Sequence, residues 1–213
     1  MPRLVNTHAF VFALLPAVVP NCAPYDESPL GSLDDEPRDG GAPRRGSDSG
    51  DVSDAAAPGA PGSQEHFAWW FKNLNYRRHP AFAKVTSAPY PSAVAGGSSI
   101  EVYVTKSLAD TYLGIRPDRT GSNASILPPT VIVREVFGVN GQLTKLTVMA
   151  KGLDGYNPDL GDWYFGEFDS RGNVLLDSNG RRRAGRLGDC YACHLPRRDD
   201  AYLFGVPDSA RAQ

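Results

Sequence analysis

An abrupt change of composition along the chain most constrains what it can fold into. Residues 23–64 consist mostly of Gly, Pro, Ser, Ala and Asp, and hold nine acidic residues against three arginines. Such a segment cannot bury enough apolar surface to offset the entropy lost on ordering, so it is predicted to be a disordered acidic linker. A packed domain must therefore come from residues 65–213, which carry 18 Lys and Arg against 15 Asp and Glu.

The N-terminus has the layout of an export signal. Arg3 precedes an apolar run of 11 residues at 9–19, which is too short to span a bilayer and fits the apolar core of a signal peptide. We therefore predict that residues 1–22 direct export to the periplasm. Cys22 follows directly, either as a lipoprotein cysteine that anchors the chain to the membrane or as an incidental residue. The residues before it, Val-Pro-Asn, are a poor match to a lipoprotein signal.

The composition is that of a soluble globular protein. Apolar residues make up 41% of the chain and charged residues 22%. The net charge of −2 creates no field that would draw the chain to nucleic acid, so we expect no nucleic-acid partner. Three cysteines are too few for a disulfide-dense scaffold, and the fold must depend on a packed core.

The clearest local pattern is a β-hairpin. Residues 131–137 and 143–151 are rich in β-formers and are joined across Asn140-Gly141, which readily supplies the positive φ angles of a tight turn. Strict alternation in the first strand places Arg134 on one face with Ile132 and Val136.

The remaining elements are short. We expect an α+β fold, a mainly antiparallel β-sheet with a few helices. The expected helices are 66–74 and 107–113, the second capped by Ser107; the expected strands are 100–104, 163–168, 173–177 and 202–206; residues 77–99 are expected to be mostly loop.

One motif carries chemistry. Residues 190–194 read Cys-Tyr-Ala-Cys-His, the attachment pattern of a c-type haem. On a helix capped by Asp189, residues Cys190, Cys193 and His194 stand at i, i+3 and i+4, and so share one face. Two sulfurs can then bond the vinyl groups of one porphyrin edge as thioethers, while His194 ligates the iron.

Three other interpretations of the cysteine pair were weighed. A zinc half-site needs two more ligands, and only His8, His66, His79 and Cys22 are available. A thioredoxin-like redox pair needs an alternating βαβ pattern, which is absent. A disulfide between Cys190 and Cys193 would close almost no loop and stabilise little. Covalent attachment of one haem c is therefore the leading hypothesis.

The sequence offers no strong ligand for the opposite side of the iron. Met149 falls in the middle of a predicted strand, where a core position is expected, and His66 and His79 are expected at the surface or as capping residues. This favours an open distal site that binds small ligands over simple electron transfer.

An ordered set of strings resembles the cytochrome P-460 and cytochrome c′-beta family. It comprises VIVRE at 131–135, LTVMAK at 146–151, GYNP at 155–158, GDW at 161–163, the motif at 190–194 and YLF at 202–204. The similarity covers roughly residues 100–206.

The resemblance implies a mainly antiparallel β fold, often a homodimer, with one haem held by Cys190, Cys193 and His194. It also implies binding of nitric oxide, and in the catalytic branch oxidation of hydroxylamine. In that branch a lysine is covalently linked to the porphyrin, and Arg134 stands at its position here. A guanidinium stays protonated and is a poor nucleophile, so we expect no such link.

Other residues have two open interpretations each. Arg134 either reaches the haem or is an ordinary strand residue. The arginines at 181, 182, 183 and 186 either face an acidic redox partner or lie in a solvated turn. Among Trp163, Tyr164, Phe165 and Phe168 about half are expected to be core residues only. Asp199 and Asp200 are expected in a surface loop.

Three functions remain open at this stage. The first is an exported haem protein that binds or turns over small nitrogen ligands, which as an enzyme would be a hydroxylamine or nitric oxide oxidoreductase. The second is a periplasmic electron carrier with a redox partner protein. The third is an exported interaction domain without haem, whose cysteines are structural.

Overall fold

The structure, a computed structural model, describes residues 64–92 and 99–213. The predicted export signal at 1–22 and, except for Gln64, the predicted linker at 23–64 lie outside the described residues. Within the described ranges, no helix is long and apolar enough to cross a membrane.

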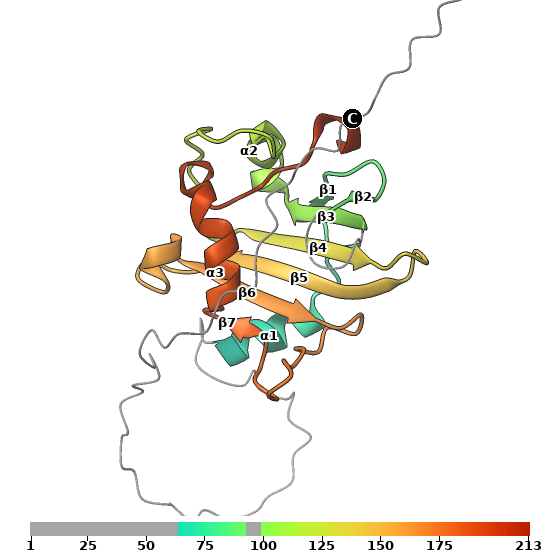
Figure 1. Cartoon of the computed structure of the whole chain (residues 1–213), viewed down its shortest axis with the longest axis vertical. Helices are drawn as coiled ribbons and strands as arrows, with labels where there is room; N and C mark the ends of the chain where they lie inside the picture. The colour runs from blue at the N-terminus through green and yellow to red at the C-terminus, as the bar shows by residue number, and fades with distance from the viewer. Residues whose placement is uncertain (1–63, 93–98) are drawn as a thin grey trace, which may run out of the picture.

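The domain is an antiparallel sheet with helices against both of its faces (Figure 1). The strands are β1 (Phe82–Lys84), β2 (Tyr90–Pro91), β3 (Ser99–Thr105), β4 (Val131–Phe137), β5 (Leu143–Lys151), β6 (Trp163–Phe168) and β7 (Ala184–Gly185). The α-helices are α1 (Gln64–Asn73), α2 (Ala109–Gly114) and α3 (Gly188–His194). Short 3-10 turns are η1 (Lys106–Leu108), η2 (Pro158–Leu160), η3 (Leu195–Asp200) and η4 (Asp208–Ala210).

The sheet is built from sequential neighbours. Its order is β1-β3-β4-β5-β6-β7, with β2 paired to β3, and every pairing is antiparallel. The β4–β5 hairpin has a short connection, so β-rich runs and turn residues in the sequence indicated it. Other connections are longer: 106–130 carries η1 and α2 between β3 and β4, and 169–183 joins β6 to β7. The predicted α+β class with a mainly antiparallel sheet is confirmed.

The central hairpin has the two predicted strands, joined by the loop 138–142. Val131 pairs with Ala150 and Val136 with Lys145, after which the register shifts before Phe137. Gly138 donates its N–H to the carbonyl of Gln142 over 2.9 Å. Of the Asn-Gly pair, Gly141 alone takes a positive φ, of 73°. The loop 138–142 is the one that the predicted strand bounds leave, but only Gly141, and not Asn140, takes the positive φ expected of the tight turn.

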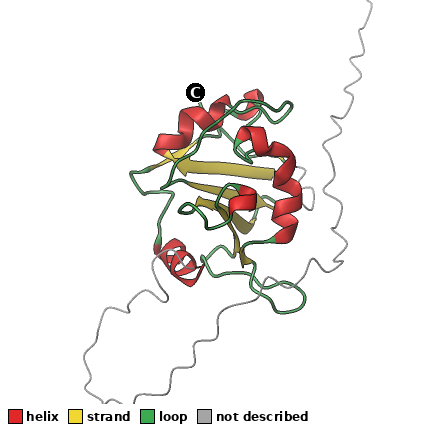
Figure 2. Cartoon of the chain, turned by 90° about the vertical axis from the view of Figure 1, so that its left-hand side faces the viewer, coloured by secondary structure: helices red, strands yellow, loops and turns green. Residues whose placement is uncertain are grey.

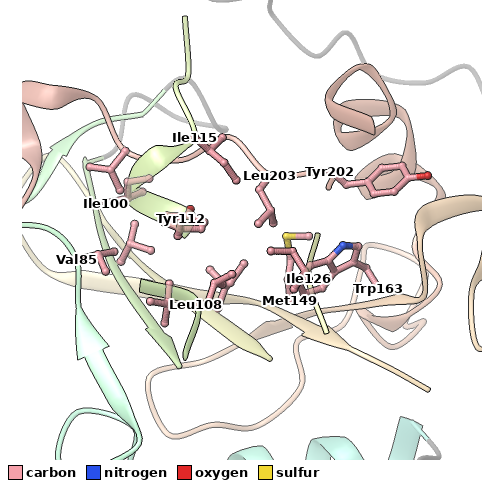
Figure 3. Packing of buried hydrophobic residues seen from close by; sticks show 14 of the residues in the cluster. Val85, Ile100, Leu108, Tyr112, Ile115, Ile126, Met149, Trp163, Tyr202 and Leu203 are labelled. Atoms are coloured by element: carbon pink, nitrogen blue, oxygen red, sulfur yellow. The ribbon is translucent and has the colours of Figure 1, made fainter. Parts of the chain in front are cut away.

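The two faces of the sheet have separate apolar clusters, as the alternation predicts. One face packs against α1 and contains Ala68, Phe71, Val133, Val148 and Phe168. The other face packs under α2, α3 and the C-terminal segment (Figures 1 and 2). Figure 3 shows part of this second cluster, where Leu203 of the C-terminal segment lies among Ile115, Met149 and Tyr202. The face under α3 is called the α3 face below.

The described residues 77–92 are mostly loop, as expected, with the short strands β1 and β2 among them. The cap predicted for the next helix is wrong. Residues 107–113 form η1 and then α2, and no side-chain cap is present at the start of either, so Ser107 is not the expected cap.

Two predicted strands do not form. In 173–177 only isolated bridges occur, Phe168 to Val174 and Leu176 to Arg182. Residues 202–206 are not a strand, because Ala201 and Tyr202 both have positive φ angles, of 53° and 65°, and turn the chain away from any strand partner.

Candidate functional site

The motif at 190–194 lies on α3, which the sequence predicted. The helix begins at Gly188, and Leu187 before it has the extended backbone of an N-cap residue, with φ −88° and ψ 117°. Asp189 is therefore inside the first turn and is not the expected cap. Its carboxylate instead meets the guanidinium of Arg183 at 2.5 Å, and an acidic group in the first turn is favourable for the helix dipole.

The two motif cysteines are chemically different in the structure. Cys190 is a half-buried free thiol that packs against the apolar cluster of the α3 face. Burial and the neighbouring Asp189 carboxylate raise the pKa of this thiol to about 12, so it stays protonated at neutral pH. Cys193 carries a disulfide bond. The alternative of a Cys190–Cys193 disulfide is therefore wrong.

The last residue of the motif, His194, is buried and held in one tautomer. Its Nδ1 lies 2.6 Å from the backbone carbonyl oxygen of Tyr202. A carbonyl can only accept, so Nδ1 carries the proton and Nε2 keeps its lone pair. Burial, together with the charge of Arg134, lowers the pKa of His194 to about 4, and the ring is neutral near pH 7.

Aromatic rings surround the imidazole of His194. The ring of Phe165 on β6 has its centroid 5.2 Å away, and the ring of Phe204 is 5.1 Å away in an edge-on arrangement. Both rings exclude water and contribute to the low pKa of the imidazole. Phe204 also contacts a positive charge, because the guanidinium carbon of Arg134 is 5.8 Å from its ring centre.

Arg134 is brought to the same region from β4. Its side chain is on the α3 face and only 9% of the residue is exposed. Nη2 lies 3.4 Å from the hydroxyl oxygen of Tyr112, a long hydrogen bond, and Nε is buried without a partner. The structure therefore brings Arg134 close to His194, although sequence reasoning also allowed an ordinary strand position.

Four charged side chains form a network beside the start of α3. Glu167 on β6 accepts from Lys145 at 2.7 Å and from Arg183 at 3.0 Å, and Arg183 continues to Asp189. Burial alone would raise the pKa of Glu167, but Lys145 and Arg183 outweigh it and hold this pKa below its ordinary value. The charges of this network act on the Cys190 thiol, and so it lies next to the motif.

The arginines at 181–186 serve mainly local contacts. Arg181 pairs with Asp177 at 2.8 Å, and the guanidinium of Arg186 stacks 5.4 Å from the ring centre of Tyr156. With Arg183 in the network above, these contacts favour the structural interpretation of the cluster.

The aromatic run of β6 divides between the two faces. Trp163 and Phe165 lie in the cluster of the α3 face, where the indole Nε1 of Trp163 donates to the carbonyl of Ala201 over 3.0 Å. Tyr164 and Phe168 lie in the opposite cluster, against α1. All four side chains are core residues, and a haem-lining role for half of them stays a prediction.

The other ligand candidates lie elsewhere or are core residues. Met149 is buried in the apolar cluster of the α3 face, as expected for a core methionine. His66 is in α1 rather than in a loop, and His79 Nδ1 accepts from the backbone N–H of Ala81 over 3.2 Å. Across 64–92 and 99–213 no three His, Cys, Asp or Glu side chains gather to form a metal site.

Arg197 was missed by sequence reasoning. It is 5% exposed and donates to the carbonyls of Arg116, Arg119 and Leu203 over 2.7, 2.9 and 3.1 Å. Asp200 was predicted in a surface loop, yet it is 1% exposed, pairs with Arg197 at 3.0 Å and accepts from the backbone N–H of Ser122. The spacing of Arg197 and Asp200, at i and i+3, was the feature of the sequence that could have indicated this ion pair.

The donor set suits a covalently attached haem. His194 presents an Nε2 lone pair from a neutral, buried ring, which is the form that ligates iron. Cys190 and Cys193 precede it on the same helix, and the surrounding clusters are apolar. Arg134 supplies a buried positive charge with an unused N–H that an anionic substituent of the porphyrin can accept from. His194, Cys190 and Arg134 thus suit the group, whereas Cys193 suits it only once its disulfide is reduced.

The chain was compared with protein families, with curated proteins and with solved structures. No family model, no curated protein and no solved structure matches it.

Proposed function

We propose that residues 65–213 form an exported c-type haem domain that binds small nitrogen ligands such as nitric oxide. One observation carries the proposal, the environment of His194. The Nδ1–H of His194 is donated to the Tyr202 carbonyl, which leaves Nε2 as the atom that can bind a metal. Cys190 and Cys193 come four residues and one residue before His194, which is the haem-attachment spacing.

Each motif residue has a defined role in this proposal. Cys190 and Cys193 would hold the haem through thioether bonds, because each S–H group can add across one vinyl group without an external oxidant. Cys193 would first need its disulfide reduced by a thiol reductant. His194 would hold the iron through Nε2, and the haem would supply the iron that binds a small ligand.

The ligand class follows from what faces the site. Met149, the thioether in the described chain, is packed in the core, and no other strong axial ligand emerged from the sequence. An iron without a strong second protein ligand is suited to bind small molecules. The similarity to the cytochrome P-460 and cytochrome c′-beta family supports the same class of ligand.

The chemistry of Arg134 favours the branch without a porphyrin cross-link. Neighbouring lysines on β5 are engaged elsewhere, Lys145 with Glu167 and Lys151 with the carbonyl of Gly161. The pKa of Arg134 stays above its ordinary value: burial opposes its charge, but the Tyr112 and Tyr90 hydroxyls outweigh that effect. A protonated guanidinium does not attack a porphyrin carbon. Oxidation of hydroxylamine is therefore expected to be slow or missing.

A second candidate is the exported interaction domain without haem. The disulfide at Cys193 favours it, because a cysteine committed to a structural disulfide cannot form a thioether. Periplasmic electron transfer is not separately favoured by any contact described above.

Optical spectra of the protein purified after export test the proposal. Spectra are recorded oxidised and reduced, with and without nitric oxide, and haem staining on a denaturing gel reports covalent attachment. The proposal expects a stained band and a ligand-dependent change in the reduced spectrum. An unstained band in an export-competent host with haem-attachment machinery would leave the interaction domain as the function. A stained band with no response to nitric oxide would favour the electron carrier.

A further inference from the structure

We propose that Arg134, with the hydroxyls of Tyr112 and Tyr90, forms a binding site for a planar monoanion that presents two oxygens, such as a carboxylate or nitrite. The site is built by β4, α2 and β2 and lies on the α3 face of the sheet. Where the anion is a haem propionate, the inference rests on the proposed function; where it is a free anion, the site needs the chain alone.

The charge on Arg134 has no counter-charge among the described residues. The groups that act on it are the hydroxyls of Tyr112 and Tyr90, and no carboxylate among the described residues pairs with it. Buried charges in proteins are almost always paired, so a buried guanidinium without a carboxylate points to an external anion.

A second buried arginine, Arg197, lies nearby and does have a carboxylate partner, unlike Arg134. The guanidinium of Arg197 stacks on the same ring, Phe204, at 5.5 Å from its centre. Arg197 is neutralised by Asp200 and donates to three carbonyls. Arg134 stacks on that ring at 5.8 Å and has neither type of partner. The fold thus supplies hydrogen-bond and charge partners for the guanidinium of Arg197, and leaves that of Arg134 available to bind an anion.

The edge of the Arg134 guanidinium that carries Nε and Nη2 determines which shape of anion can bind. Nη2 of Arg134 is 3.4 Å from the Tyr112 hydroxyl, which is long enough to be given up, and Nε is buried with no partner. The Nε and Nη2 N–H groups point in parallel from a planar fork, which matches two oxygens of one planar anion. Burial of Tyr90 raises the pKa of its hydroxyl, so this hydroxyl stays a donor.

The anion has two possible sources with the same chemistry. One is a propionate carboxylate of a bound haem, and the other is a free anion such as nitrite. Either source gives Arg134 a carboxylate-like partner, and an experiment can separate them.

Isothermal titration of the full chain with sodium nitrite at constant ionic strength tests the site. The chain is prepared both as exported and as produced in the cytoplasm without haem. Arg134→Gln removes the charge and the fork, and Tyr112→Phe removes one hydroxyl. Arg186→Gln is the matched control, because it removes an exposed arginine that stacks on Tyr156. Thermal unfolding of each variant confirms that it is folded.

We expect one saturable nitrite site in the haem-free chain, weakened at least tenfold by Arg134→Gln and changed less than twofold by Arg186→Gln. Persistence of that site in the haem-loaded chain identifies a free anion as the ligand. Its loss on haem loading, with a propionate band in the resonance Raman spectrum that shifts in Arg134→Gln, identifies the propionate.

Folded chains that bind no nitrite in either form, with a propionate band that Arg134→Gln leaves in place, would overturn the site. Equal nitrite affinity in Arg134→Gln and Arg186→Gln would also overturn it. If no haem is found at all, the proposed function fails, but titration of the haem-free chain still decides on the anion site.

Discussion

The Nδ1 of His194 and the backbone carbonyl of Tyr202 are joined over 2.6 Å, between a helix end and the segment that follows it. This contact is possible because Ala201 and Tyr202 adopt positive φ angles and bring the chain back over α3. A backbone carbonyl cannot be altered by substitution of its own side chain, so the orientation of the imidazole depends on where the segment 201–206 docks.

Docking of that segment can be disturbed at Gly205. This residue has a φ of 68°, and a Cβ there would lie 2.1 Å from the carbonyl oxygen of Ile115. We expect Gly205→Ala to lower the free energy of unfolding by about 2–4 kcal/mol, because the segment must shift or the backbone must strain. Urea unfolding measures this value. Gly114→Ala is the control, since its Cβ would meet nothing within 4 Å, and it should change stability by less than about 0.5 kcal/mol.

Covalent haem should depend on both motif sulfurs. The double substitution Cys190→Ala with Cys193→Ala removes both atoms that can form thioethers, and the exported protein should lose its haem stain on a denaturing gel. Cys22→Ser should keep the stain, because Cys22 is outside the motif. Haem that survives denaturation in the double variant would refute the assignment of the motif.

The number of covalent bonds to the haem should be two. Arg134 has no usable nucleophile, and Lys145 and Lys151 are engaged in other contacts. Peptide mapping by mass spectrometry should therefore find haem only on the peptide that contains residues 190–194. A haem adduct on a peptide from β4 or β5, or a strongly red-shifted reduced Soret band, would place the protein in the cross-linked branch.

Glu167 should give the stability a defined pH dependence. Its pKa is lower folded than unfolded, so its ionised form stabilises the fold above the unfolded value of about 4.3, and this contribution is lost as pH falls through the folded pKa. We expect Glu167→Gln to cost about 1–3 kcal/mol at pH 7, because Lys145 and Arg183 lose their shared partner.

The cost of Glu167→Gln should shrink below about pH 4, where the wild-type carboxylate is also being protonated. Urea unfolding at pH 7 and at pH 3 measures both values. Glu101→Gln is the matched control, since its partner Lys84 is on the edge strand β1 with 35% of its side chain exposed, and it should cost less than about 1 kcal/mol. A cost for Glu167→Gln that stays equal at the two pH values would contradict the assignment.

Elements whose signal is local were predictable from the sequence. The strands 131–137 and 143–151 are runs of β-forming residues bounded by turn residues, so their bounds follow from the sequence, and 190–194 needs only a helix to align its three residues. The placement of Arg134 on the face of α3 follows from the alternation of side chains along a strand.

Elements that depend on distant partners were not predictable. Residues 202–206 have the composition of a strand, but positive φ angles within them prevent it. Arg197 also donates to the carbonyl of Leu203 in this segment and to the carbonyls of Arg119 and Arg116, which are 78 and 81 residues from Arg197 in sequence. The residue type of Asp189 predicts a helix cap, but in the structure its carboxylate pairs with Arg183, which the sequence does not indicate. The interior positions of Arg197 and Asp200 likewise follow from a pairing that residue type alone does not indicate.

The fork of Arg197 has a consequence for the order in which the molecule assembles. It ties the carbonyls of Arg116 and Arg119, made early in the chain, to that of Leu203, near its end. Contacts of such high sequence separation form after local ones, so this clasp closes late in folding. Until the clasp closes, residues 116–119 and the segment that carries Leu203 are not fixed to each other, so the part of the domain around Arg197 is completed last.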